Sequence, residues 1–372
     1  MSLSFPQLAG LVPAHVQKAE AYIPSKPDDI LQALYQAPFL YRMNNNENPL
    51  GPTQLARQAI AAFHPPMAAV YPSGDAYHLR CRLAETFGHH ADCYLVGNGA
   101  NEVIAFVIKA FCREGDNIIT ADRTFAVYEW VAEFSGFEAR LVPLKDHGFD
   151  DDAMLQAMDE RTKVIFICNP NNPTGSYWTE EKLRGFLKKV DNRCIVVLDE
   201  AYAEFVEGAE FPDGLKLLDE YPNLVVFRTF SKMYGLASLR IGYLAGQPDV
   251  VGIIRKTCVV YSVNGPAQAA ALATLNDGAE HIVRTRALVR ESKEYLLRGI
   301  SDLPIPYIAG EGNYVILHMP GSDTLVYRKL MQQGYMVRTM TGFRMPNHIR
   351  VTLQPLHVME GFLHALKAVL TC

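Results

Sequence analysis

Short apolar runs alternate with helix-like segments through the middle of the chain. The apolar runs, each bounded by turn residues, are CYLVGN, NIITA, ARLVPL, KVIFICN, CIVVLDE, LVVFRTF and IGYLAG. Between several of them, apolar positions recur at helical spacing in NEVIAFVIKAF, AVYEWVAEFSG, DDAMLQAMDE and TEEKLRGFLKKV. Buried strands alternating with helices are typical of a mostly parallel sheet with helices on both faces. The pattern predicts a large α/β domain over residues 53–265.

The pattern changes on both sides of this region. After about residue 265, a long helical stretch over 266–300 leads to the strand candidates NYVILHM, YMVRTM and HIRVTL and to a closing helix over 358–370. This grouping predicts a smaller α+β domain over 266–372. Residues 1–52 are rich in Pro and Asn and show little periodicity. They predict an N-terminal arm that packs on another part of the molecule or on a second subunit.

Composition narrows the class of protein. The 372 residues include 35 Lys and Arg against 40 Asp and Glu, with no basic block, which argues against nucleic acid or an anionic membrane as partner. No apolar run is long enough for a membrane helix, and the N-terminus does not resemble a signal peptide. The seven cysteines are scattered without a CxxC pair. They predict reduced thiols in a cytoplasmic protein, without a zinc site.

Candidate chemistry follows the apolar runs, because ligands bind at the carboxyl ends of strands in open α/β sheets. Lys232 follows LVVFRTF and has Thr229, Ser231 and Arg240 close by in sequence. It is either an ordinary surface lysine or an amine of lowered pKa that forms an imine with an aldehyde.

Asp199 ends the run CIVVLDE, and Tyr202 follows three residues later. A carboxylate here either caps the next helix or holds a protonated heteroaromatic nitrogen through a charge-assisted hydrogen bond. The second interpretation fits pyridoxal 5′-phosphate (PLP), whose protonated ring serves as an electron sink. Tyr202 would then meet the phenolic oxygen of the same ring.

Three further segments carry weaker signals. NPNNPTG places an asparagine cluster that includes Asn172 after a strand, which suggests an amide aimed at a ligand oxygen. In YLVGNGAN, small residues open a helix and expose backbone N–H groups to a phosphate, although the segment is neither GxGxxG nor a P-loop. Phe125 and Tyr128 follow NIITA, and such aromatic rings either belong to the core or stack on a planar cofactor.

Together and in this order, these segments resemble the fold type I PLP-dependent aminotransferases, and the histidinol-phosphate aminotransferase branch is the nearest match. NPNNPTG, VLDEAY and TFSKMYGLASLR stand roughly thirty residues apart, and the resemblance extends from about Tyr22 to Arg350. It implies an aspartate-aminotransferase-like fold, a homodimer, and PLP as cofactor. It also implies histidine biosynthesis, with amino transfer from L-histidinol phosphate to 2-oxoglutarate giving imidazole acetol phosphate and L-glutamate.

The resemblance assigns roles around the cofactor. Lys232 matches the Schiff-base lysine and proton carrier, and Asp199 matches the partner of the pyridine nitrogen. Tyr202 and Asn172 match the residues around the ring oxygen, and Phe125 matches the stacking position. The phosphate-binding residues correspond to Gly99, Ala100, Asn101, Thr229, Ser231 and Arg240, with Tyr71 reaching the cofactor of the other subunit.

On the substrate side, Arg350 resembles the arginine that binds the carboxylate of glutamate and the phosphate of histidinol phosphate. Arg338 and Tyr22 match further phosphate contacts, and Asn46 and Glu47 lie in the part of the arm that lines the cleft.

The sequence also departs from the branch. Phe125 stands where tyrosine is usual, Asn101 where aspartate is common, and Ser25 where glycine is common. An aromatic or other amino-acid aminotransferase is therefore an alternative, and a PLP decarboxylase of an amino-acid phosphate is another. DNA-binding regulators of this fold carry an added helix-turn-helix domain, for which the chain has no room and no basic patch.

Overall fold

The computed structural model describes residues 10–19 and 25–371 and has a seven-stranded sheet at its centre. The strands lie in the order β2-β8-β7-β6-β5-β3-β4, and their bounds are β2 (Tyr94–Gly97), β3 (Asn117–Ala121), β4 (Glu138–Val142), β5 (Thr162–Cys168), β6 (Ile195–Asp199), β7 (Leu224–Thr229) and β8 (Gly242–Gly246). Among the described residues, β8 is the one strand of this sheet that runs opposite to the other six. The predicted mostly parallel sheet is confirmed.

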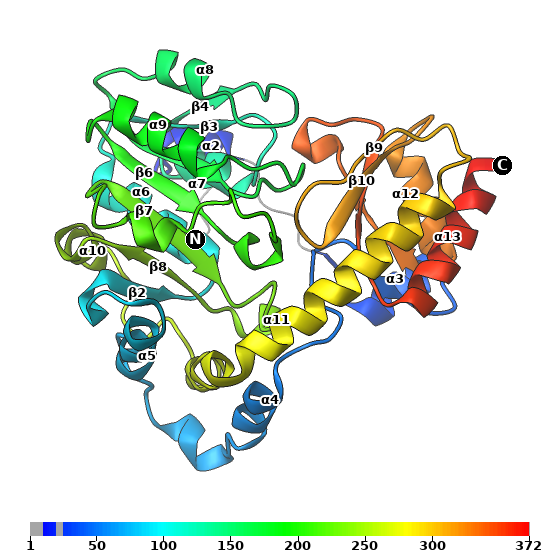
Figure 1. Cartoon of the computed structure of the whole chain (residues 1–372), viewed down its shortest axis with the longest axis horizontal. Helices are drawn as coiled ribbons and strands as arrows, with labels where there is room; N and C mark the ends of the chain where they lie inside the picture. The colour runs from blue at the N-terminus through cyan, green and yellow to red at the C-terminus, as the bar shows by residue number, and fades with distance from the viewer. Residues whose placement is uncertain (1–9, 20–24, 372) are drawn as a thin grey trace.

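Helices cover both faces of this sheet (Figure 1). They are α5 (Tyr77–Phe87), α6 (Ala100–Phe111), α7 (Val127–Phe134), α8 (Asp151–Gln156), α9 (Glu180–Val190) and α10 (Pro248–Arg255). Every residue of β6 is buried, as expected for a strand covered on both sides. α9 shows how the sequence defines its helix: the Thr179 side chain accepts from the Lys182 N–H, and acidic and basic residues occupy the first and last turns.

A long helix, α11 (Gly265–Gly299), runs from the large lobe to the smaller lobe (Figure 1). The smaller lobe has an antiparallel sheet in the order β12-β13-β10-β9, made of β9 (Tyr307–Ile308), β10 (Tyr314–His318), β12 (Arg338–Thr339) and β13 (His348–Thr352). α12 (Asp323–Gln332) and α13 (Leu356–Thr371) pack with it, and α11 also contacts α4 (Gln54–Ala61). No helix among residues 10–19 and 25–371 is both long and apolar enough to cross a membrane.

The N-terminal arm packs against both lobes. It contains α2 (Ala14–Lys18), α3 (Asp28–Tyr35) and β1 (Tyr41–Arg42), and β1 pairs in parallel with β11 (Tyr335–Met336) of the small lobe. Farther along, the Asn48 amide donates to the Met233 carbonyl in the large lobe at 2.6 Å. We propose a division into arm (1–52), large domain (53–265) and small domain (266–372), with residues 43–48 of the arm joining the two domains.

Candidate active site

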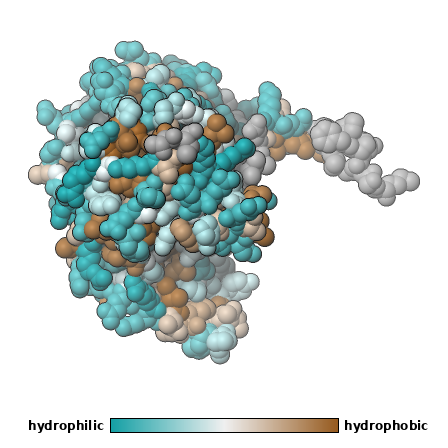
Figure 2. Space-filling view, turned by 90° about the vertical axis from the view of Figure 1, so that its right-hand side faces the viewer, coloured by the Kyte–Doolittle hydropathy of each residue, from teal (hydrophilic) through white to brown (hydrophobic). Residues whose placement is uncertain are grey.

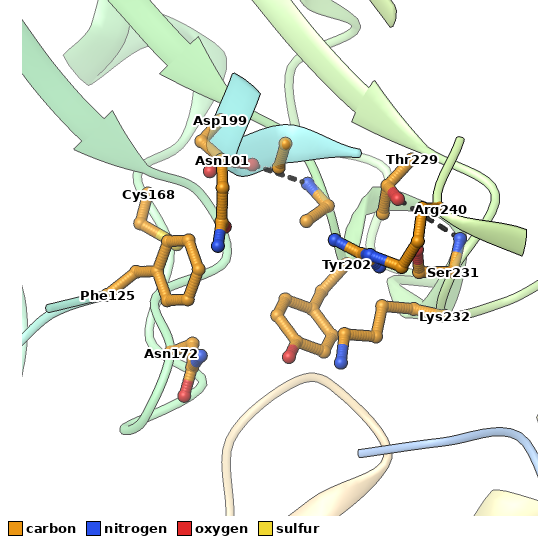
Figure 3. A pocket seen from close by; sticks show the side chains of 12 residues that line it. Asn101, Phe125, Cys168, Asn172, Asp199, Tyr202, Thr229, Ser231, Lys232 and Arg240 are labelled. Atoms are coloured by element: carbon orange, nitrogen blue, oxygen red, sulfur yellow. Dashed lines mark hydrogen bonds between the residues drawn. The ribbon is translucent and has the colours of Figure 1, made fainter. Parts of the chain in front are cut away.

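A pocket lies where the carboxyl ends of β5, β6 and β7 meet the start of α6, as the sheet topology predicts. Figure 3 shows Phe125 and Asp199 on one side and Thr229, Ser231 and Arg240 on the other. The pocket is lined by Ala100, Asn101, Phe125, Cys168, Asn172, Asp199, Ala201, Tyr202, Thr229, Ser231, Lys232 and Arg240. The structure therefore brings together the residues predicted around the cofactor, except Gly99 and Tyr71, and it adds Cys168 and Ala201.

Lys232 follows the end of β7, and its amine points into the pocket beside the Tyr202 hydroxyl (Figure 3). Its Nζ donates to the backbone carbonyl of Asn45 at 2.6 Å. Burial and the positive charge of Arg350 lower the pKa of this amine to about 8, against the opposing effect of Glu47. A larger fraction of the amine is therefore neutral and nucleophilic near neutral pH than for an ordinary lysine.

Asp199 is buried at the end of β6. Its Oδ1 accepts from the Ala201 N–H at 3.1 Å, and its Oδ2 accepts from the Tyr128 hydroxyl at 2.5 Å. Burial raises the pKa of this carboxyl group, and the two hydrogen bonds oppose that effect. Within residues 10–19 and 25–371, Asp199 forms no ion pair, so a cation in the pocket would stabilise its charged form.

Tyr128 has a role that the sequence did not reveal. Its ring is fully buried and stacks on Phe166 with centroids 4.7 Å apart, while its hydroxyl holds Asp199. Phe125, three residues earlier, is the ring that lines the pocket. A partner 71 positions away in sequence produces no local pattern, and only the sheet order places the two side chains together.

The opposite end of the pocket is suited to an anion. Gly99 is the N-cap residue of α6 with a φ of +81°, and it has no side chain that could cap the helix. A Cβ at Gly99 would collide with the Arg240 guanidinium, so glycine allows the arginine to lie against the helix N-terminus. The Ser231 N–H donates to Thr229 Oγ1 at 3.0 Å. Free helix amides, hydroxyls and a guanidinium are the groups that bind phosphate.

A second cleft of about 480 Å³ opens beside the first. Arg350 of β13 is buried, donates to Asn172 Oδ1 at 2.5 Å and to the Asn44 carbonyl at 2.8 Å, and has no partner for its Nε among the described residues. Arg338 faces it across the strand pair β12–β13. The cleft is lined by Asn45, Asn46, Asn101, Phe125, Ala126, Val127, Trp130, Asn172, Tyr202, Lys232, Arg240, Arg338, Phe343 and Arg350.

The remaining predicted residues lie in different places. Asn46 lines the cleft and donates to the Tyr202 hydroxyl at 2.8 Å. The backbone carbonyl of Glu47, in the same segment, accepts from Asn313 at 3.3 Å. Tyr71 is 80% exposed and stacks on Tyr261, and Tyr22 lies outside the described residues.

The chemistry of these groups fits PLP. Asp199 is a buried carboxylate that forms no ion pair with any residue the structure describes, which suits a protonated ring nitrogen, and an amine of lowered pKa suits an aldehyde. The anion-binding end suits the phosphate, and Phe125 provides an aromatic face for the ring. Each requirement of the cofactor is thus met by a different group of the same pocket.

The fold and the pocket together define a PLP-dependent enzyme, and comparison with known proteins gives its family. Residues 40–369 match the family model described as aminotransferase class I and II, and the chain belongs to this family, which uses PLP. The prediction from the sequence is confirmed in its family, its cofactor and its class of activity.

Relatives of known name are similar to this chain over nearly its whole length. It is 39% identical over 359 residues to histidinol-phosphate aminotransferase 2 of Pseudomonas fluorescens. The alignment covers 95% of this chain and 96% of the relative. The chain is 40% identical over 357 residues to histidinol-phosphate aminotransferase of Symbiobacterium thermophilum, covering 95% and 97%.

Solved structures share the fold. Histidinol-phosphate aminotransferase from Sinorhizobium meliloti in complex with pyridoxal-5′-phosphate has a TM-score of 0.85 at 23% identity, over 97% of both chains. A Thermus thermophilus aspartate aminotransferase mutant has a TM-score of 0.81 at 19% identity, over 96% of this chain and 99% of that one. The predicted aspartate-aminotransferase-like fold is confirmed.

Proposed function

We propose that the protein is a histidinol-phosphate aminotransferase, transferring the amino group of L-histidinol phosphate to 2-oxoglutarate in histidine biosynthesis. The observation that carries the proposal is the neighbouring pair Arg338 and Arg350 on the wall of a cleft that also contains Lys232. Two guanidinium groups in this place can bind the phosphate of one substrate and the carboxylate of the other. The relatives that cover nearly all of the chain support this substrate pair.

We propose the following roles around PLP, which when bound supplies an aldehyde for the amine and a ring that accepts electrons. Lys232 forms the covalent link, and Asp199 keeps the ring nitrogen protonated. Tyr202 already accepts from Asn46, so its own proton is available for the ring oxygen. The Asn172 amide accepts from Arg350 through Oδ1, which leaves its Nδ2 to donate to the same oxygen.

At the other end, Arg240, Thr229, Ser231 and the backbone amides of Ala100 and Asn101 bind the cofactor phosphate. This end contributes a fixed positive charge and donors that are held by the main chain. Phe125 packs on the ring face, as an aromatic side chain without a hydroxyl still can.

When it is not bound to the aldehyde, Lys232 would act as the general base and acid. Burial and Arg350 lower its pKa to about 8, so the freed amine takes a proton from the substrate carbon and returns it to the neighbouring position. The 2.6 Å hydrogen bond to the Asn45 carbonyl holds the amine in one direction. Arg350 meanwhile holds the distal anion of the substrate and fixes the reacting carbon near the amine.

The amino donor is tested by a half-reaction screen. Histidinol phosphate, added alone to the PLP-loaded enzyme, is expected to remove the visible absorption of bound PLP faster than phenylalanine or tyrosine does. The reason is that only its phosphate dianion engages both Arg338 and Arg350. Absorbance after each addition measures this directly. Preference for an aromatic amino acid would replace the proposed donor, and release of CO2 without any need for 2-oxoglutarate would indicate a decarboxylase.

We further propose that the enzyme is a cytoplasmic homodimer, with Tyr71 completing the phosphate site of the partner subunit. Apolar side chains gather on one exposed surface, where Val70, Tyr71, Val260 and Tyr261 are all exposed. Met67, in the same part of the chain, is also exposed, and pale brown residues gather beside teal ones near the lower end of the molecule in Figure 2. Such patches are usual at interfaces between subunits.

The described cysteines are free, which supports a reducing compartment.

The dimer is tested by mixing two inactive partners. Tyr71→Ala subunits and Lys232→Ala subunits are each expected to give weak or inactive homodimers. A mixed dimer would regain one complete site, with Lys232 from one chain and Tyr71 from the other. Co-expression of the two should therefore restore about half of the native activity per mixed dimer. A monomeric mass in solution, or no recovery in purified mixed dimers, would contradict the shared site.

A further inference from the structure

One of the contacts between the small and the large domain lies at the mouth of the cleft and is made by a short loop, residues 341–344. It begins with the 3₁₀ turn Thr341–Phe343 and ends at Arg344, whose φ is +57°. We propose that this loop is a strap that holds the cleft closed, and that Phe343 and Arg344 are positioning residues for the substrate-binding arginines. The proposal deepens the proposed function and rests on it only in taking Arg338 and Arg350 as the anion-binding pair.

Arg344 attaches the strap to the large domain. Its Nη2 and Nη1 donate to the two carboxylate oxygens of Glu129 on α7 at 2.6 and 2.9 Å, and its Nη1 also donates to the Asp122 carbonyl at 3.1 Å. Bidentate geometry fixes direction as well as distance. A partly exposed pair contributes little to the stability of a fold, so the value of this contact lies in the position it imposes.

Phe343 connects the strap to the chemistry. Its ring lines the cleft, and the guanidinium carbons of Arg338 and Arg350 each lie 5.7 Å from its centroid. A ring at this distance attracts a guanidinium group through its π-face. Arg350 is also held by Asn172 and by the Asn44 carbonyl, but Phe343 is the ring that contacts both arginines, so its position contributes to their spacing and to the place where the distal anion of a substrate is held.

The strap is anchored firmly at its small-domain end. Asp323 is buried, and its Oδ2 accepts from the Met340 N–H, the Thr341 N–H and the Thr341 hydroxyl at 3.1, 3.0 and 2.8 Å. With this end fixed, release of Arg344 would free the Phe343 end of the loop and the contact that this loop makes with the large domain. Phe343, Arg344 and Glu129 do not line the pocket of Lys232 and Asp199, so cofactor binding should be unaffected.

Trp130, next to Glu129 on α7, provides a direct reporter of the cleft. The chain has two tryptophans. Trp130 lines the cleft and is 38% exposed, whereas Trp178 is 4% exposed in the core. Quenching of fluorescence by acrylamide therefore reports mainly on Trp130, and a Trp130→Phe enzyme supplies the background from Trp178.

The test compares three PLP-loaded variants with the native enzyme. Two are the single variants Arg344→Ala and Glu129→Gln, and the third is the charge swap, a double variant that carries both Glu129→Arg and Arg344→Glu. In the single variants, KM for the donor and Kd for inorganic phosphate should rise about tenfold, with kcat changed less than about threefold. Acrylamide quenching should rise as the cleft opens, while the visible absorption stays unchanged. The charge swap should recover much of the lost affinity.

Arg184→Ala is the matched control. Arg184 makes a similar bidentate pair with Glu220, at 2.6 and 3.0 Å, inside the large domain, and its loss should leave all five readouts unchanged. Native KM, phosphate affinity and quenching in Arg344→Ala and Glu129→Gln would overturn the strap. Inorganic phosphate tests the arginine pair whichever amine is the donor, so failure of histidinol phosphate in the donor screen is a separate result.

Discussion

Replacing Lys232 with alanine is expected to abolish the visible absorption of bound PLP and to lower the rate of amino transfer by at least about 10⁴-fold. The side chain supplies both the amine that joins the cofactor aldehyde and the base that moves the proton. Its pKa of about 8 depends on burial and on Arg350, so a lysine elsewhere cannot replace it. Absorbance spectra and single-turnover rates measure the two losses separately.

Lys293→Ala is the control for this result. Lys293 also has a pKa lowered by burial and donates to a backbone carbonyl, that of Gly310, at 2.8 Å, but it lies outside the pocket. Its loss should leave the absorption intact. A purified Lys232→Ala protein that kept the native absorption would show that the covalent link is made elsewhere.

Replacing Asp199 with asparagine is expected to lower the rate about 10²- to 10³-fold, because an amide of the same shape cannot stabilise a protonated ring nitrogen. The variant should also bind PLP more weakly. The cofactor-free protein should not lose stability, since the substitution removes a buried charge that forms no ion pair in the described chain. Thermal unfolding with and without PLP, together with single-turnover rates, separates these effects.

Tyr128→Phe is the graded control. It removes the hydroxyl that donates to Asp199 at 2.5 Å but keeps the buried ring and the carboxylate. Its rate should fall between the native and Asp199→Asn values. An Asp199→Asn enzyme with native rate and native PLP affinity would show that the carboxylate does not hold the ring nitrogen.

The sequence predicted the large sheet well because each of its strands is a run of apolar residues bounded by turns. It did not predict the direction of β8, because a strand buried on both faces has no feature that distinguishes parallel from antiparallel pairing. The pairing of β1 with β11 also escaped prediction. Each strand has two residues, and they lie at opposite ends of the chain.

The cofactor pocket was predictable because its residues follow strand ends, which the topology gathers at one edge of the sheet. The contacts that hold the pocket and cleft residues in place were not predictable from the sequence. These contacts depend on side-chain directions across loops. They are the hydrogen bonds of Tyr128 to Asp199 and of Asn46 to Tyr202, and the contacts of the Phe343 ring with two arginines. Such directions are set by tertiary packing and leave no spacing in the sequence.

The acceptor of the Lys232 amine is a main-chain carbonyl, that of Asn45, whose residue is itself exposed. Every amino acid at position 45 would present the same oxygen, so no single substitution can delete this acceptor. The neighbouring side chain of Asn46 contacts Tyr202 and lines the cleft and can change without removing it. The group that orients the reactive amine, the carbonyl of residue 45, therefore persists through mutation. The Asn46 side chain beside it can change, and such changes could give related enzymes different amine donors.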